Sequence, residues 1–485
     1  RAAMSPPTFA SASEHARQIR ARAYSARELT EHYIGRIEAL DGAVNAVVVR
    51  DFERARAAAD AADAALAQGA AVGPLHGVPM TIKESFNVAG LPTTWGLPVF
   101  RDNTAATDAA VVASLRSAGA IILGKTNVPV ELADFQSFNP IYGTTNNPWN
   151  PERVPGGSSG GSAAALAAGF SALEFGSDIG GSIRNPAHFC GVYGHKPTWD
   201  IVPAQGHALP GLLATPDIAV VGPLARSADD LRLALEITAG PGPLRRGWRL
   251  DLPRPTRTRL ADYRVAVWPN DPRSPVATEV ADRVQSLADR LARAGATVSA
   301  TARPAIDLDH SFEAYLYMLN GVLGAGLPPE AEGALAAEVA ALDPNDRSVD
   351  AINLRSMVQK HSDWLRFSNV REAQRYAWRE FFSSFDILIC PQMPTPAFAH
   401  DQSTPMAARR VMIDNEAHPY FQQIYWAGAI TVSYLPSTVF PTGPSRDGLP
   451  IGLQAVGAEF DDLVCIDFAR LVADEIGGFT PPPGY

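Results

Sequence analysis

Three short stretches of this 485-residue chain carry lysine, serine and glycine in patterns that could support nucleophilic chemistry. The first, GVPMTIKESF, places Lys83 at the end of an apolar run. The second, PGGSSGGSAAALAAG, starts at Pro155 and sets Ser158 among glycines. The third, EFGSDIGGSIRNP, ends a glycine turn at Ser182. Together they offer a base, two hydroxyls and a run of unhindered backbone N–H groups.

The glycine–serine loop around Ser158 has three interpretations when it is taken alone. It could be a tight turn before a helix, with Ser162 as the N-cap of SAAALAA. The second interpretation is a phosphate-binding loop of a nucleotide-binding module, which needs a lysine and then a serine or threonine after its last glycine. Here the last glycine is followed by Ser162 and then by an alanine, which argues against this interpretation. The G-x-S-x-G pattern from Gly156 to Gly160 also fits a hydrolase nucleophile elbow. The loop by itself leaves the structural turn and the elbow open.

The second glycine stretch, GSDIGGSIR, adds a different possibility. Its glycines leave successive backbone N–H groups free to converge on one point, which can stabilise an oxyanion without a side-chain donor. Ser182 at the end of the turn would have its hydroxyl beside those donors. A purely structural turn between two elements fits the same residues.

Lys83 is an uncommon choice in this chain, which has only four lysines among its 41 basic residues. Burial disfavours the charged ammonium, so a buried lysine can act as a base near pH 7, whereas an arginine cannot. The alternative is a lysine that extends from the end of a strand into solvent.

Taken together, GVPMTIKESFNVAG, PGGSSGGSAAALAAG and GSDIGGSIRNPAHFCGVYGHKPT resemble the amidase signature family. The resemblance runs from Leu75 to Pro223, and weaker similarity continues in FDILICPQMPTP and GLPIGLQAVG. Three motifs in the expected order, with matching spacing between the two serines, make it specific.

The resemblance implies a Ser–Ser–Lys triad. Ser182 would be the nucleophile, and Lys83, neutral at rest, would be the general base that later helps to protonate the leaving amine. Ser158, which follows a cis peptide bond in this family, would relay the proton between them. The implied oxyanion hole consists of the backbone N–H groups of Ile179, Gly180, Gly181 and Ser182.

The resemblance also implies supporting roles for nearby residues. Asp178 and Arg184 are expected to pair across the turn and hold its shape. Substrate would contact a segment near the scissile bond that comprises Leu132, Ala133 and Asp134. Further hydroxyl, imidazole and thiol groups are expected to be loop, cap or packing groups rather than reacting ones: Ser159, Ser162, His188, His195 and Cys190.

Strand-like and helix-like segments alternate along the chain, which predicts an α/β fold. We expect a single large α/β/α sandwich over residues 1–485, with a mixed, twisted central sheet covered by helices on both faces. The core motifs span 75–223, and a helical insertion over the pocket is expected at 305–380. Near the C-terminus, FDILICP, AITVSYLP and IGLQAVG are predicted strands.

Composition excludes several classes of protein. The net charge of −10, with no basic stripe, argues against nucleic acid as a partner, and the apolar runs are too short to span a membrane. Three scattered cysteines and the lack of a hydrophobic signal core predict a cytoplasmic protein. No metal-ligand cluster or dinucleotide fingerprint is visible, so no metal or organic cofactor is expected.

The predicted reaction is hydrolysis of the C–N bond of a non-peptide amide that is hydrophobic or bears an aryl group, with carbamates and esters as further substrates. The alternative is the glutaminase-type A chain of an amidotransferase, which acts with a partner chain. Ile179, where those chains typically carry Thr, favours a stand-alone amidase, as a monomer or homodimer. Aromatic residues near the C-terminal half could bind an aryl group or belong to the core: Trp364, Phe367, Tyr420, Phe421, Tyr425 and Trp426.

Overall fold

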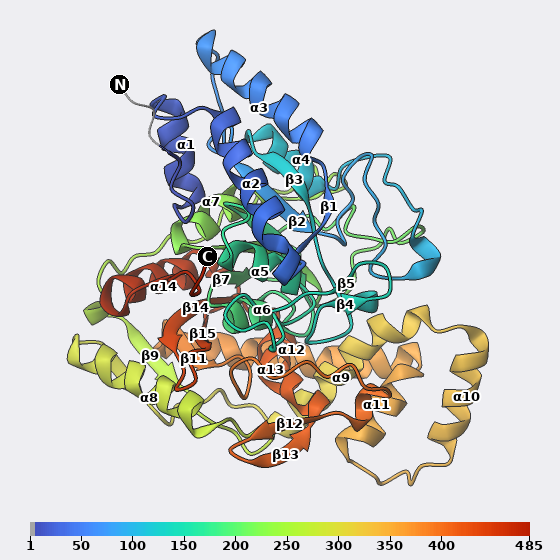
Figure 1. Cartoon of the computed structure of the whole chain (residues 1–485). Helices are drawn as coiled ribbons and strands as arrows, with labels where there is room; N and C mark the ends of the chain where they lie inside the picture. The colour runs from blue at the N-terminus through green and yellow to red at the C-terminus, as the bar shows by residue number, and fades with distance from the viewer. Residues whose placement is uncertain (1–4) are drawn as a thin grey trace.

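The computed structural model describes residues 5–485 and is built around an eight-stranded mixed sheet (Figure 1). Three strands at one edge pair in parallel, and the remaining neighbours pair antiparallel. The strands across the sheet are, in order, β10 (Thr297–Ser299), β9 (Arg264–Val267), β11 (Ile387–Pro391), β15 (Pro450–Val456), β14 (Ser437–Pro444), β7 (Tyr193–Lys196), β8 (Val220–Ala225) and β6 (Glu174–Asp178).

A second, three-stranded sheet lies beside the end of the large one. Its order is β1 (Val47–Arg50), β3 (Ile121–Thr126) and β2 (Pro79–Lys83). The Thr81 N–H on β2 donates to the carbonyl of Leu173, just before β6, at 3.3 Å. The last residues of β2 and β6 are thereby brought together, although they are far apart in the sequence.

Helices cover both faces of the large sheet, as the sequence predicts. In chain order they are α1 (Ala12–Arg20), α2 (Ala26–Val44), α3 (Phe52–Ala67), α4 (Ala110–Ser117), α5 (Gly160–Ala167), α6 (Arg184–Cys190), α7 (Ala228–Thr238), α8 (Thr278–Arg293), α9 (Leu308–Leu323), α10 (Pro329–Ala340), α11 (Val349–Met357), α12 (His361–Ser384), α13 (Tyr425–Thr431) and α14 (Asp462–Ile476). Both α6 and α14 pack on β14 and β15, while α7 packs on β8 and α8 on β11. The α/β/α sandwich with a mixed central sheet is therefore confirmed.

Two apolar clusters form the core. The larger one joins the N-terminal helices to the sheet and includes α5, whose eight residues are all buried. The second cluster lies among α9, α12 and α13 and contains the buried indoles of Trp268, Trp378 and Trp426. The turn between β6 and α6 lies where the two clusters meet, since Ile183 belongs to the first and Ile179 packs against the second.

Two local predictions are wrong. AITVSYLP is not a strand: its first residues complete α13, and the strand β14 begins only at Ser437. This helix is buried on every side, so its apolar run carries no helical periodicity to distinguish it from a buried strand. Ser162 is not an N-cap either. It lies inside α5, and its hydroxyl is 3.0 Å from that of Thr126.

Most of residues 305–380 is helical, over α9 to α12. Helix α9 is half in the core and contacts α11, α12 and α13. In contrast, α10 has no buried residue and stands at the edge of the molecule (Figure 1). The segment thus joins a helix that is part of the core to one that is almost entirely exposed.

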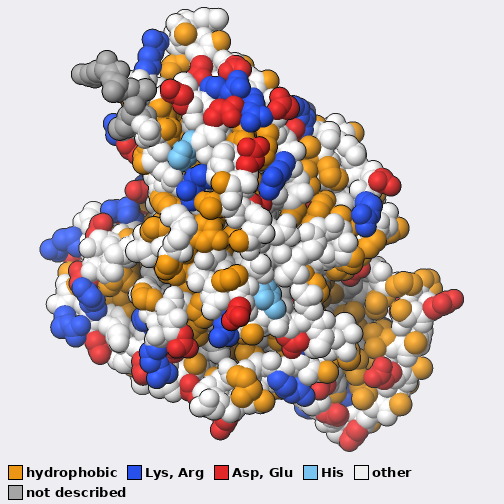
Figure 2. Space-filling view, in the orientation of Figure 1, with side chains coloured by type: hydrophobic (Ala, Val, Ile, Leu, Met, Phe, Trp, Pro, Cys, Tyr) orange, Lys and Arg blue, Asp and Glu red, His pale blue; other side chains and the backbone are white. Residues whose placement is uncertain are grey.

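The surface seen in Figure 2 carries acidic and basic side chains interspersed. Many of them form ion pairs, such as Arg27 on α2 with Asp60 on α3 at 2.6 Å. Within residues 5–485, no helix is long and apolar enough to cross a bilayer.

Candidate active site

Lys83 is the last residue of β2 and is completely buried. Its Nζ donates to Ser158 Oγ at 2.6 Å and to Ser177 Oγ at 2.9 Å. Burial lowers the pKa of Lys83 to about 7, although the nearby charges of Asp178 and Glu174 act to raise it. An amine in this setting is available as a base near neutral pH.

Ser158 lies in the loop before α5, after a cis peptide bond from Gly157. The loop is locked against the turn that carries Ser182: the Ser159 N–H donates to the carbonyl of Ser182 at 3.0 Å. On the other side, Asn185 Oδ1 accepts from the Gly157 N–H at 2.9 Å. These two bonds place the backbones of the two serine motifs in direct contact.

Exposure increases from the lysine to the second serine. Lys83 is 0% exposed, Ser158 1% and Ser182 8%. Among the described residues, none forms a hydrogen bond with Ser182 Oγ, whereas Ser158 Oγ is held by Lys83. Of the three groups, Ser182 is therefore the one most open to an incoming substrate, and the amine is the most protected from water.

The turn between β6 and α6 presents backbone N–H groups next to Ser182. Within residues 5–485, the N–H groups of Ile179, Gly180 and Ser182 have no hydrogen-bond partner. The Gly181 N–H differs, because it donates to Asp178 Oδ1 at 3.0 Å. Three of the four donors that the resemblance implies are thus free, while the fourth ties the turn to Asp178.

Asp178 and Arg184 form an ion pair under this turn, with 2.8 Å between Arg184 Nη2 and Asp178 Oδ1 and both side chains fully buried. Burial alone would raise the pKa of Asp178, but the charge and hydrogen bonds of Arg184 hold it at about 2. The carboxylate also accepts from the N–H of Ile183 at 3.1 Å. The guanidinium donates on to Thr431 Oγ1 and Gln454 Oε1, so the turn is fixed to α13 and β15.

The expected substrate segment lies against the Ser158 loop. A Cβ on Gly157 would overlap the backbone carbonyl oxygens of Asp134 and Gln136, so the two segments are in close contact. Leu132 is half-buried and Ala133 is exposed. The Asp134 side chain is turned to protein partners: Arg409 donates to it at 2.7 Å and Tyr420 at 2.5 Å.

The histidines near the motif make structural contacts. His188 lies 2.8 Å from the carbonyl of Thr395 and accepts from the Gly452 N–H, and burial lowers its pKa to about 4. His195 is bound to Asp462 and Thr438. Cys190 is buried, and burial raises its thiol pKa. Of the aromatic candidates, Tyr420, Tyr425 and Trp426 are buried in the core cluster of α9, α12 and α13, while Trp364, Phe367 and Phe421 are partly buried against it.

Two residues of the site escaped the sequence analysis. Ser177, the second acceptor for Lys83, stands directly before Asp178, and only the meeting of β2 with β6 reveals its role. Asn185 follows Arg184 and reaches the Gly157 N–H. The pattern GSD before the turn could have drawn attention to Ser177, but nothing in the sequence marks Asn185.

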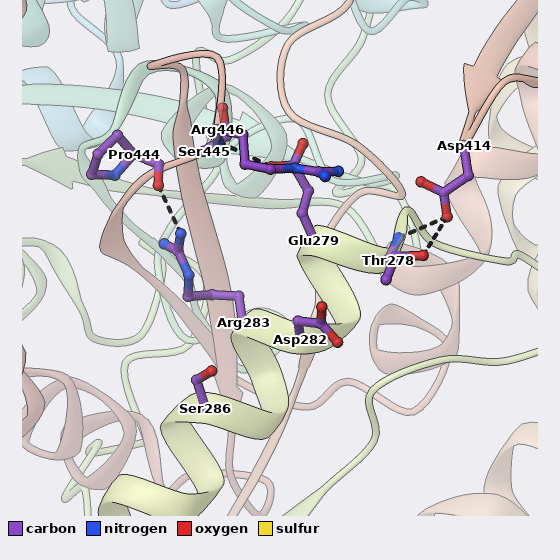
Figure 3. Close-up of a pocket in the computed structure, with 9 residues that line it drawn as sticks. All are labelled: Thr278, Glu279, Asp282, Arg283, Ser286, Asp414, Pro444, Ser445 and Arg446. Atoms are coloured by element: carbon purple, nitrogen blue, oxygen red, sulfur yellow. Dashed lines mark hydrogen bonds and ion pairs between the residues drawn. The ribbon is translucent and has the colours of Figure 1, made fainter.

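A polar groove elsewhere on the surface contains none of these residues (Figure 3). It lies between the first turns of α8 and the end of β14, and Asp414 caps α8 there by accepting from Thr278. The groove is lined by Thr278, Glu279, Asp282, Arg283, Ser286, Asp414, Pro444, Ser445 and Arg446. Across residues 5–485, no group of three His, Cys, Asp or Glu side chains is arranged to hold a metal ion.

Comparison with known proteins places this chain in a family. An indoleacetamide hydrolase from Bradyrhizobium diazoefficiens is 33% identical over 481 residues, which cover 96% of this chain and 86% of that protein. The A chain of the glutamyl-tRNA(Gln) amidotransferase from Anaeromyxobacter dehalogenans is 32% identical, with 96% of each chain covered. The solved structure of a bacterial aryl acylamidase superposes with a TM-score of 0.80 at 25% identity, covering 97% of this chain and 96% of the other.

The family model described as amidase matches residues 28–466, which is nearly the whole chain. With this match and relatives above 30% identity over 96% of its length, the chain belongs to the amidase signature family of hydrolases.

Proposed function

We propose that this protein hydrolyses the C–N bond of a hydrophobic or aryl-bearing, non-peptide amide through an acyl-enzyme on Ser182. The main support is the contact between a fully buried Lys83 and Ser158, at 2.6 Å, beside an open Ser182. This arrangement offers an amine whose pKa of about 7 leaves much of it neutral near physiological pH, a hydroxyl that can relay a proton, and a nucleophile open to substrate.

In the first half-reaction, Ser182 Oγ attacks the amide carbonyl carbon. Its proton passes to Ser158, while the Ser158 proton passes to Lys83. When the C–N bond breaks, the Lys83 ammonium returns the proton through Ser158 to the leaving amine. The products of this step are a free amine and an ester on Ser182.

In the second half-reaction, water attacks the acyl-enzyme ester with the same lysine as base, releasing a carboxylic acid and Ser182. The negative charge that develops on the carbonyl oxygen in both steps would be stabilised by the free N–H groups of Ile179, Gly180 and Ser182. The Gly181 N–H donates to Asp178 instead, and this hydrogen bond holds the turn in shape.

The substrate class is supported by two relatives whose names specify aromatic amides, an indoleacetamide hydrolase and an aryl acylamidase. Esters and carbamates of similar shape share the acyl-enzyme step, so they are expected substrates as well. Cleavage of the C–N bond of a carbamate would place an alkoxycarbonyl or aryloxycarbonyl group on Ser182, whereas loss of its alcohol or phenol would place a carbamoyl group there.

The test is a hydrolysis panel with p-nitroacetanilide, a long-chain fatty amide, a small aliphatic amide, glutamine and an aryl carbamate. Purified protein is assayed beside its Ser182→Ala variant. We expect the parent to cleave p-nitroacetanilide and the variant to be inactive. Full turnover by Ser182→Ala of every amide that the parent cleaves would refute the assignment.

The similarity to the A chain of an amidotransferase, over 96% of this chain, favours a second candidate. In that case the protein would release ammonia from glutamine and pass it to a partner chain. This candidate predicts glutamine as the preferred substrate and co-purification with a second polypeptide. The stand-alone amidase instead predicts an active monomer or homodimer on a sizing column.

A further inference from the structure

Tyr315, on α9, touches the turn that carries the free N–H groups, although it lies more than a hundred residues later in the chain. Its hydroxyl donates to the carbonyl oxygen of Ile179 at 3.0 Å. The side chain is fully buried, and burial raises the pKa of its phenol, so the hydroxyl stays a donor across the working pH range. No sequence motif pointed to this contact.

The ring of Tyr315 is held in a slot that leaves it little freedom. A Cβ on Gly428 of α13 would overlap the ring, and a Cβ on Gly180 would lie 3.1 Å from its hydroxyl oxygen. Phe312, one turn earlier on α9, stacks beside it with 6.3 Å between ring centroids. A ring fixed by two glycines and an aromatic neighbour directs its hydroxyl to one place.

The consequence for the turn follows from peptide geometry. The carbonyl of Ile179 and the N–H of Gly180 belong to the same planar trans peptide, so they point in opposite directions. Holding the carbonyl oxygen toward α9 therefore turns the Gly180 N–H away from α9. Within residues 5–485, this N–H has no protein partner.

Asp178 and Tyr315 hold different parts of the turn. Asp178 binds the N–H groups of Gly181 and Ile183, on the side toward α6. Among the described residues, no hydrogen bond from that side reaches the peptide between Ile179 and Gly180, and Tyr315 supplies one from α9. Without it, this peptide could rotate and turn its N–H away from the reacting carbonyl.

We propose that Tyr315 is a positioning residue of the oxyanion hole, which fixes the Ile179–Gly180 peptide so that the Gly180 N–H faces the reacting carbonyl oxygen. The inference rests on the proposed function, because it assigns the turn to oxyanion stabilisation. It also gives α9 a defined role: the helix is part of the catalytic scaffold.

The test compares Tyr315→Phe with the parent and with Tyr317→Phe as the matched control. Phe keeps the ring in its slot and removes only the hydroxyl. Tyr317 lies on the same helix, away from the turn, and its ring stacks on that of Phe367 with 4.0 Å between the ring centroids. Removing its hydroxyl therefore measures the effect of a similar change elsewhere in α9. The assay measures kcat and KM for p-nitroacetanilide and the Ki of a trifluoromethyl ketone of matching shape.

For Tyr315→Phe we expect kcat to fall about ten- to a hundredfold, below the about 10²–10³ loss for removing an oxyanion donor outright. KM should stay within about twofold, because the contact acts on the transition state rather than on bound substrate. The adduct of the ketone with Ser182 carries an oxyanion, so the affinity of the enzyme for the ketone should fall in parallel with kcat. Tyr317→Phe should match the parent in all three values.

Equal kcat and equal ketone affinity in Tyr315→Phe and the parent would overturn the inference. A loss that falls on KM alone, with ketone affinity unchanged, would overturn it as well. Ser182→Ala is assayed in the same series. If that variant keeps full turnover, the proposed function fails; if it is inactive while Tyr315→Phe behaves like the parent, only the role of Tyr315 fails.

Discussion

At the scale of single residues, the proposed mechanism depends on the protonation state of Lys83. Burial disfavours the ammonium, while the carboxylates of Asp178 and Glu174 favour it, and the balance leaves a pKa of about 7. Burial, and to a lesser extent the charge of Lys83, lowers the pKa of His207 to about 3, so this imidazole stays neutral. Burial also raises the pKa of Glu174 to about 7, so this carboxyl group gains or loses its proton over the same pH range as Lys83.

The first prediction concerns this titration. Because the base must be neutral, kcat/KM should be low at pH 5, rise through a midpoint near the pKa of about 7 and level off on the alkaline side. Lys83→Met should lower kcat by about 10²–10⁴, the usual contribution of a general base. Lys360→Met, at an exposed lysine, is the control and should keep the activity of the parent. An optimum at pH 5 would point to a carboxylate base instead.

The second prediction concerns Ser177, which accepts a hydrogen bond from Lys83 at 2.9 Å. An acceptor stabilises the ammonium more than the neutral amine, so removing it lowers the pKa of the lysine. Ser177→Ala should therefore shift the acid limb of the kcat/KM profile below that of the parent. A limb that stays in place, or moves upward, would show that this hydroxyl does not act on the protonation of Lys83.

The residue types of the site could be predicted from the sequence, but their full set of partners could not. Lys83, Ser158 and Ser182 stood out because their apolar and glycine-rich stretches, taken together, resemble the amidase signature family. Ser177 and Tyr315 did not, because their contacts arise only when β2 meets β6 and α9 packs on the turn. Hydrogen bonds between segments so far apart leave no local pattern.

At the scale of elements, the site depends on how closely two loops approach. Gly157 lies where any side chain would overlap the carbonyl oxygens of Asp134 and Gln136, which are backbone atoms that cannot move aside cheaply. The loop before α5 and the segment before Ser137 thus fit only with glycine at this position. The same contact sets the distance between the expected substrate segment and Ser158.

The third prediction follows from this contact. Gly157→Ala should destabilise the fold by about 1–3 kcal/mol, as overpacking does, and should lower kcat because Ser158 is displaced. Gly35→Ala, in the middle of α2 with open space around it, is the matched control. It should gain about 0.5–1 kcal/mol, since alanine is the better helix former. Urea unfolding measures both, and equal stabilities would contradict the packing argument.

The order of elements was largely predictable because apolar periods and caps are local signals, as for α7, which begins after its N-cap Ser227. The exception at residues 429–436 has a physical reason. A short segment buried on all sides shows an apolar run in either conformation, so only the packing of α13 against α9 decides that residues 429–431 end a helix and that no strand begins before Ser437.

At the scale of the whole molecule, distant parts of the chain are joined through charged groups next to the site. Asp134 comes from the first third of the sequence, and Arg409 and Tyr420 come from the last third. The Asp134 and Arg409 side chains are 5% and 3% exposed. The expected substrate segment is thus attached to a region near the C-terminus, which the sequence could not indicate.

The fourth prediction tests this link. Arg409→Met leaves the Asp134 carboxylate buried without its cation, which should cost about 3–5 kcal/mol of unfolding free energy. The double variant Arg409→Met/Asp134→Asn removes the stranded charge and should recover part of that loss. Urea unfolding of the parent and the three variants, including Asp134→Asn alone, measures the coupling. Additive losses in the double variant would show that the two side chains do not stabilise each other.

The central claim is that catalysis proceeds through an acyl group on Ser182. The most direct test is to mix the protein with a p-nitrophenyl ester, quench with acid before deacylation is complete, and map the added mass by peptide mass spectrometry. The account predicts one acyl group on the peptide that contains Ser182 in the parent, and neither adduct nor turnover in Ser182→Ala. An adduct on another residue, or a Ser182→Ala variant that hydrolyses amides at the parent's rate, would contradict it.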